Sequence, residues 1–227
     1  MNQSLIRDEL ELLDGLVDLA HRPRVIELGC GAAQLSRRLL ERFPASEVTA
    51  LEVDERQHAK NVAVPQPGIT FMKAGAQAVP LGDAQFDLAL MLKSLHHVPV
   101  PLMAHALAEV ARLLKPGGHL YVSEPVFGGP LNEVMRLFHD EQVVRAAAQA
   151  ALDAHAVVPS RWGTVRGRLS GLAGGCVLNL QFSPSLDPLP EERVWGPQGA
   201  FAAKVEPPGD ATLTEQFVAW TGRRPRP

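Results

Sequence analysis

One stretch near the start of the chain reads Arg24-Val25-Ile26-Glu27-Leu28-Gly29-Cys30-Gly31-Ala32-Ala33. Its apolar part, from Val25 to Leu28, predicts a short buried strand. A tight glycine turn follows, and a helix is expected from Gln34 to Arg42. Gly29 and Gly31 lack the Cβ atoms that would block a ligand from approaching the backbone. The stretch therefore predicts a strand, a turn and a helix whose unpaired N–H groups face a ligand.

The residues around the two glycines indicate which ligand is bound. A dinucleotide fingerprint, G-x-G-x-x-G, requires glycine at position 34, where the chain has Gln34. Glu27 lies two residues before Gly29 and would repel a pyrophosphate. Its carboxylate suits a ligand that ends in an ammonium group and carries a sulfonium. A glycine pair can also serve only to pack a strand on a helix, so the turn by itself leaves both roles open.

The pattern E-x-G-x-G, formed by Glu27, Gly29 and Gly31, resembles motif I of the class I S-adenosylmethionine (SAM)-dependent methyltransferases. Ala33 stands where that motif often has a third glycine. The resemblance implies SAM as the cofactor, and it places Glu27, Gly29, Cys30 and Gly31 at the cofactor site.

A second strand, Val48 to Leu51, ends in Glu52, about twenty residues beyond the glycine turn. In nucleotide-binding α/β units, an acid at this place accepts hydrogen bonds from the ribose hydroxyls. Asp54 is the rival, but it is better placed to cap the helix expected from Glu55 to Val62. We therefore predict that Glu52 binds the ribose.

The segment Lys73 to Pro80 resembles the G-D-A-E-x-L-P segment of many small-molecule methyltransferases, in which the Asp meets the adenine amino group. Gly75 occupies the matching position here, so that carboxylate is missing. Adenine recognition is then expected from backbone groups or from Gln77.

An apolar run from Phe86 to Leu92 predicts a central strand covered on both faces. Lys93 follows at its carboxyl end, where open α/β sheets bind ligands, and is a candidate cofactor contact. His96 and His97 come next and are the candidate catalytic bases, since unperturbed histidine titrates near pH 6.5. The alternatives are a solvated lysine and histidines that only hydrogen-bond the loop.

An amphipathic helix is expected from Val100 to Leu114, and Lys115 to Gly118 should end it. A fifth strand, His119 to Ser123, follows, and Glu124 at its end is a candidate acceptor contact. With a short third strand at Ile69 to Met72, strands and helices alternate five times. This alternation predicts an α/β, doubly wound, mostly parallel Rossmann-like sheet. The L-L-K-P-G-G run resembles the "type 11" branch of the methyltransferases, which acts on small molecules.

Beyond residue 125 the alternation of strands and helices is harder to recognise in the sequence. A long helix is expected from Leu131 to about Ala156, with His139, Asp140 and Glu141 forming a polar helix face and no metal site. We divide the chain into a SAM-binding domain, residues 1–158, and an irregular Gly- and Pro-rich region, 159–227. That region is open to several interpretations, including completion of the sheet and a substrate lid. Within it, residues 176–182 predict a strand, and 212–221 predict a helix or a strand.

The composition limits the classes of partner and the cellular location that we expect. The 227 residues are 46% hydrophobic, which suffices for one core, and the net charge of −3 argues against nucleic acid as a partner. The longest apolar runs are shorter than a membrane span. Both cysteines, Cys30 and Cys176, are expected as free thiols, and with no apolar leader this indicates a cytoplasmic protein.

These observations predict a SAM-dependent methyltransferase that transfers a methyl group to a small-molecule acceptor. Such a reaction requires alignment of the reactants and no metal. A catalytically silent SAM-binding or partner-binding module of the same fold is the alternative. An NAD-dependent oxidoreductase is less favoured because of Gln34. The oligomeric state and the acceptor atom are left open.

Overall fold

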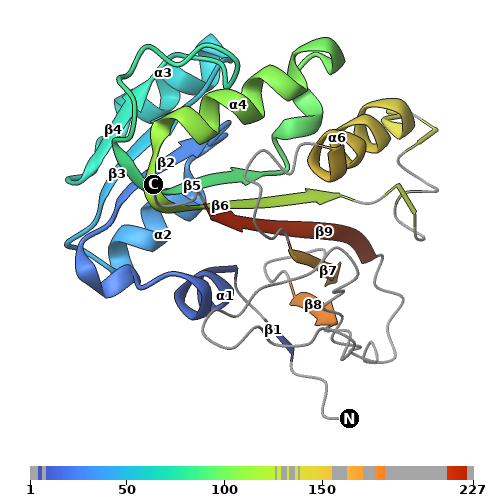
Figure 1. The fold of residues 1–227 in the computed structure, drawn as a ribbon, viewed down its shortest axis with the longest axis horizontal. Helices are drawn as coiled ribbons and strands as arrows, with labels where there is room; N and C mark the ends of the chain where they lie inside the picture. The colour runs from blue at the N-terminus through green and yellow to red at the C-terminus, as the bar shows by residue number, and fades with distance from the viewer. Residues whose placement is uncertain are drawn as a thin grey trace.

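The computed structural model describes residues 5–6, 9–125, 127–128, 132, 136–137, 139–154, 163–170, 177–181 and 214–223. In this part of the chain a single nine-stranded sheet has the order β1-β8-β7-β9-β6-β5-β2-β3-β4 (Figure 1). The strands are β1 (Leu5–Ile6), β2 (Arg24–Leu28), β3 (Glu47–Leu51), β4 (Ile69–Met72), β5 (Phe86–Leu92), β6 (Leu114–Pro125), β7 (Gly163–Ser170), β8 (Val177–Gln181) and β9 (Thr214–Arg223). The helices are α1 (Glu9–Leu16), α2 (Gln34–Arg42), α3 (Glu55–Ala63), α4 (Met103–Leu113) and α6 (Gln142–Ala154), with short 3-10 turns η1 (Leu19–His21), η2 (Leu95–His97) and η3 (Val100–Leu102).

The five strands from β2 to β6 are parallel, which confirms the doubly wound α/β sheet. Their hydrogen-bonded order is β4-β3-β2-β5-β6. At the carboxyl ends, Leu28 is level with Leu51, and Leu92 is level with Ser123. The segments that leave these strands therefore meet at one edge of the sheet, where open α/β sheets bind their ligands.

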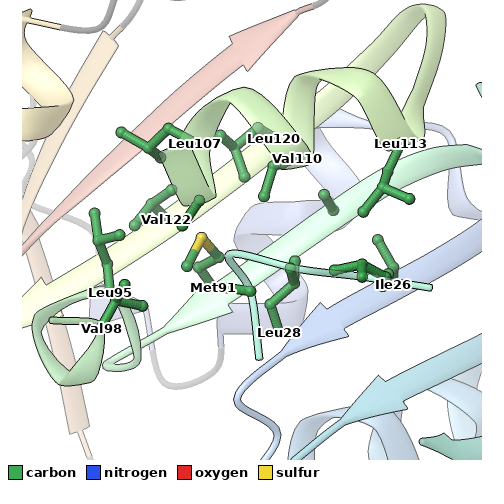
Figure 2. Packing of buried hydrophobic residues seen from close by; sticks show 14 of the residues in the cluster. Ile26, Leu28, Met91, Leu95, Val98, Leu107, Val110, Leu113, Leu120 and Val122 are labelled. Carbon is green, nitrogen blue, oxygen red and sulfur yellow. The ribbon is translucent and has the colours of Figure 1, made fainter. Parts of the chain in front are cut away.

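Successive residues of β5 face opposite sides of the sheet, as the period of a strand requires. Leu88 and Leu90 belong to a core cluster with α1 and α2. Ala89 and Met91 belong to a second cluster with α4 and α6. Figure 2 shows part of that second cluster between the sheet and α4. Both faces of the central strand are thus buried, so the segments at its carboxyl end are held by a packed core on each side.

Antiparallel strands extend the sheet beyond β6. β9 pairs with β6, and β7 and β8 follow it. The strand predicted at residues 176–182 is confirmed as β8, and the helix-or-strand alternative at 212–221 is resolved as strand β9. β7 was not predicted, because the Gly- and Arg-containing stretch from 163 to 170 has weak apolar alternation. The division of the chain after residue 158 stays a prediction.

Three predicted boundaries were wrong. A single helix is expected from Leu131 to Ala156, but α6 begins only at Gln142. Residues 139–141 lie outside the helix, and the Asp140 carboxylate accepts the Gln142 N–H, 3.0 Å away, at its start. The helix expected from Val100 begins as the 3-10 turn η3 and becomes α-helical only at Met103. The strand expected from His119 begins earlier, since β6 starts at Leu114, with a shift in register against β5.

Every helix of the described residues is too short or too polar to cross a membrane.

Candidate active site

The two glycines of the turn after β2 have different surroundings. Both have left-handed backbones, with φ of 77° at Gly29 and 52° at Gly31. The N–H groups of Gly29 and Cys30 donate to the Leu51 carbonyl, at 3.0 and 2.8 Å. A Cβ on Gly29 would lie 2.6 Å from Cβ of Ser94, whereas a Cβ on Gly31 would meet no atom within 4 Å. Position 29 therefore has room only for glycine, because any Cβ there would clash with Ser94, whereas Gly31 borders open space.

The end of β5 is tied to this turn. The Ser94 hydroxyl donates to the carbonyl of Leu28, 2.7 Å away. Lys93 beside it has a left-handed φ of 53°, an uncommon conformation for a residue with a side chain, and its N–H donates to the Ser123 carbonyl at 2.6 Å. The half-buried Lys93 and the buried Ser94 thus join the ends of β2, β5 and β6. Ser94 was missed in the sequence because a single serine in a loop carries no pattern.

Glu27 is a buried carboxylate, 4% exposed, at the end of β2. It accepts a hydrogen bond from the Ser36 hydroxyl on α2. Burial raises the pKa of Glu27 to about 7, the Ser36 bonds oppose this, and the negative charges of Glu9 and Glu52 add to it. Among the described residues no cationic side chain pairs with Glu27. A buried acid without a cation fits a ligand that carries its own ammonium group.

Glu52 directly follows β3 and is 8% exposed. Its Oε2 accepts the N–H of Gly31 at 2.8 Å, and its Oε1 accepts the N–H of Asp54 at 2.9 Å. A carboxylate has about four acceptor positions, so two remain for hydroxyl groups. Asp54 caps α3 by accepting the Gln57 N–H at 2.7 Å, which is the role predicted for it.

Gln77 occupies the space that a side chain at position 75 would need. Its Oε1 and Nε2 lie 2.6 and 2.7 Å from where a Cβ on Gly75 would be. The half-buried carboxamide of Gln77 thus lies next to Gly75. An amide carries both donors and an acceptor, so it can pair with the edge of a purine base.

His96 is buried and held by Glu124 at the end of β6. Its Nδ1 lies 2.5 Å from Glu124 Oε2, while Glu124 Oε1 accepts the N–H groups of Ser94 and Leu95, at 3.0 and 2.7 Å. An ionised carboxylate only accepts, so Nδ1 donates in this bond and Nε2 is the ring nitrogen left to face other groups. The exposed His97 ring lies 4.1 Å from that of His96, and desolvation together with His96 lowers the pKa of His97.

Glu141 approaches the two histidines from the segment before α6. Its Oε2 is held by Arg145, at 2.7 Å from Nη2, whereas Oε1 lies 2.9 Å from Nε2 of His139 and 3.8 Å from Nε2 of His96. The prediction that residues 139–141 form a polar helix face was wrong, because they precede the helix and the Glu141 carboxylate is only 11% exposed. The sequence carried no signal for this contact, which depends on how α6 packs on η2.

A parallel α/β sheet with a glycine turn after its first parallel strand, and a buried acid at the end of the next, is the arrangement typical of nucleotide-binding α/β folds. Residues 25–118 match the family described as a methyltransferase domain. The match is to the same kind of protein that the sequence motifs predicted, a class I SAM-dependent methyltransferase.

Two relatives and one solved structure illustrate the match. An uncharacterised methyltransferase of Mycobacterium tuberculosis is 36% identical over 111 residues, 48% of this chain and 42% of that protein. The 27-O-demethylrifamycin SV methyltransferase of Amycolatopsis mediterranei is 31% identical over 117 residues, 49% and 42% of the two chains. A SAM-dependent methyltransferase from Thermotoga maritima has the same fold, with a TM-score of 0.55, 19% identity, and coverage of 95% of this chain and 87% of that one. The chain thus spans less than half the length of these two relatives.

Proposed function

We propose that the protein is a SAM-dependent methyltransferase that acts on a small-molecule acceptor. The observation that carries this proposal is a pair of buried carboxylates, Glu27 and Glu52, at the ends of two adjacent strands, with Glu52 bonded to the N–H of Gly31 and open space beside Gly31. Glu27 would bind the ammonium group of SAM, and Glu52 would bind its ribose hydroxyls. Gln77 would recognise the adenine, while Lys93 and the backbone of Gly29 and Cys30 would line the site.

SAM supplies an already activated methyl group, so the protein must align the acceptor and exclude water. Alignment alone can account for as much as about 7–11 kcal/mol of a barrier. We propose that His96 and His97 meet the acceptor, because they follow β5 at the carboxyl edge of the sheet. The rifamycin enzyme among the relatives supports a small molecule as acceptor, by its name. The free thiol of Cys30 supports the cytoplasmic location that we propose.

Glu52→Ala should weaken S-adenosylhomocysteine binding by about 10- to 100-fold, because each hydrogen bond to a charged group contributes roughly 1.5–3 kcal/mol. Asp54→Ala is the matched control, since it removes a carboxylate two residues away that caps α3. Asp54→Ala should lower the free energy of unfolding by about 1 kcal/mol and keep the affinity for S-adenosylhomocysteine within about twofold of the wild type. Isothermal titration calorimetry and urea unfolding measure the two quantities.

Absence of binding heat with well-folded wild-type protein would reject the proposed function. Equal affinity in Glu52→Ala and wild type would remove Glu52 from the site. A protein that binds SAM with these properties, yet methylates nothing in a broad metabolite screen, would instead be a silent SAM-binding module.

His97→Ala should lower turnover by about 10²- to 10⁴-fold, the range that a positioned acid or base contributes, while the SAM dissociation constant stays unchanged. The His97 side chain is exposed, so its removal leaves the core intact. His105→Ala is the control, because His105 is an exposed histidine of α4. Release of S-adenosylhomocysteine with a productive acceptor is the readout. Unchanged turnover in His97→Ala and in a matching His96 variant would exclude a catalytic role for both.

A further inference from the structure

The histidines after β5 and the acid before α6 together have the donor set of a metal site. We propose that His96, His97 and Glu141 bind one divalent first-row transition-metal ion, with Zn²⁺ as the first choice. This inference goes beyond methyl transfer, which requires no metal, and metal binding can be measured without SAM.

The three side chains converge although Glu141 lies far along the chain from the two adjacent histidines. One ligand atom from each lies within 4.8 Å of the other two. The 3.8 Å between His96 Nε2 and Glu141 Oε1 is too long for a hydrogen bond. It is close to the roughly 3.3 Å that separates two ligands of a tetrahedral zinc ion with bonds of about 2.0–2.1 Å. Small side-chain rotations would bring all three atoms to bonding distance of one ion.

Glu124 is an independent second observation. Histidines that bind a metal almost always donate their other ring N–H to a carboxylate or carbonyl, which fixes the tautomer and the ring orientation. Glu124 is fully buried and makes this contact with Nδ1 of His96. Its other oxygen is held by two backbone N–H groups, so the carboxylate cannot turn away. His96 Nε2, the nitrogen that would bind a metal, is therefore held facing Glu141.

Glu141 is positioned in a similar way. Arg145 holds Oε2 through two nitrogens, at 2.7 and 3.0 Å, so Oε1 is aimed at the histidines. The present partner of Oε1 is Nε2 of His139, whose side chain is 66% exposed and can turn into the solvent. An ion would thus exchange one surface hydrogen bond for a coordination bond.

Two imidazoles and one carboxylate form a donor set used for zinc with an open fourth position, and also for non-haem Fe²⁺. Mg²⁺ prefers oxygen ligands alone and should not bind. The open position would accept an oxygen of a small-molecule ligand, such as a phenolate or a carboxylate.

The test uses the full chain, freed of metal by a chelator and titrated with Co²⁺, whose visible absorption reports coordination by nitrogen and oxygen. Wild-type protein should bind one equivalent, which Zn²⁺ displaces and Mg²⁺ does not. His97→Ala and Glu141→Gln should each weaken Co²⁺ binding at least about tenfold, because loss of a residue that only supports a metal ligand already costs about 10- to 100-fold. His105→Ala should bind as the wild type does. An anaerobic Fe²⁺ titration shows whether iron competes with zinc.

Three results would overturn the metal site. They are no stoichiometric Co²⁺ uptake by wild-type protein, equal uptake by His97→Ala, and an equal loss in His105→Ala. Far-ultraviolet circular dichroism shows whether each variant is folded, and His97→Ala keeps the test valid because its side chain is exposed. S-adenosylhomocysteine binding by the metal-free protein is measured alongside, so that failure of the metal site and failure of the proposed function are distinguished.

Discussion

Gly29→Ala should destabilise the protein by about 2–5 kcal/mol, whereas Gly31→Ala should leave it folded but unable to bind SAM tightly. An alanine at 29 adds a Cβ only 2.6 Å from Cβ of Ser94, in a backbone with φ of 77°. The left-handed conformation costs about 1–2 kcal/mol, and overpacking costs about 1–3 kcal/mol more. That sum is a large part of the 5–15 kcal/mol that typically separates folded from unfolded protein.

Gly31→Ala tests the other glycine with the same change of one methyl group. The backbone conformation again costs about 1–2 kcal/mol, but the new Cβ meets no atom within 4 Å. It would instead occupy the open space proposed for SAM. Urea unfolding should therefore show the larger loss for Gly29→Ala, and calorimetry with S-adenosylhomocysteine should show the loss of affinity in Gly31→Ala.

A double-mutant cycle isolates the steric contact. Ser94→Gly removes the Cβ that an alanine at 29 would strike, at the expense of the hydrogen bond to Leu28. Gly29→Ala should therefore cost less in the Ser94→Gly background than in the wild type, by about the 1–3 kcal/mol of overpacking. Strict additivity of the two changes would show that the contact is not the cause.

Between about pH 5 and pH 8, the free energy of unfolding of the ligand-free protein should fall as the pH rises, because of Glu27. Burial is the chief cause that raises the pKa of Glu27 to about 7 from its ordinary value of 4.5. Between these values the folded state binds the proton that the unfolded state releases, so stability decreases with pH. A difference of 2.5 in pKa corresponds to about 3 kcal/mol at pH 8. The groups that face the carboxyl are Ser36, Glu9 and Glu52.

Glu27→Gln keeps the shape and the acceptor for Ser36 but cannot ionise. The variant should be about 3 kcal/mol more stable than wild type at pH 8 and nearly equal to it at pH 5, by chemical unfolding at both pH values. It should nevertheless bind SAM less tightly, since the carboxylate that would meet the ammonium group is gone. Equal pH dependence in the variant and the wild type would contradict the raised pKa of Glu27.

The same titration should be visible in ligand binding. A bound ammonium group favours the ionised form of Glu27, so SAM binding near pH 6 should release up to one proton and strengthen as the pH rises to 7. Calorimetry in buffers of different ionisation enthalpy counts this proton. Glu27→Gln serves as the control and should release less. A wild-type protein that binds SAM without proton release near pH 6 would place the ammonium group elsewhere.

Local sequence signals determined the parallel part of the fold and its glycine turn. Apolar runs and turn residues located all five parallel strands, because periodicity and turn chemistry act within a few neighbouring residues. The same local rules separated Asp54, which caps a helix, from Glu52, which faces the turn. The predicted contacts of Glu27, Gln77, Lys93 and the histidines with ligands stay predictions.

Only the tertiary structure decided what surrounds these residues. Ser94 lies beneath Gly29 because the carboxyl ends of β2 and β5 are adjacent in the sheet. His96 meets Glu124 because β5 and β6 are neighbours, and it meets Glu141 because α6 packs against η2. The physical reason is that such contacts depend on how crossover connections return to the sheet. A serine, a histidine or a glutamate at a loop position carries no mark of the partner that lies tens of residues away.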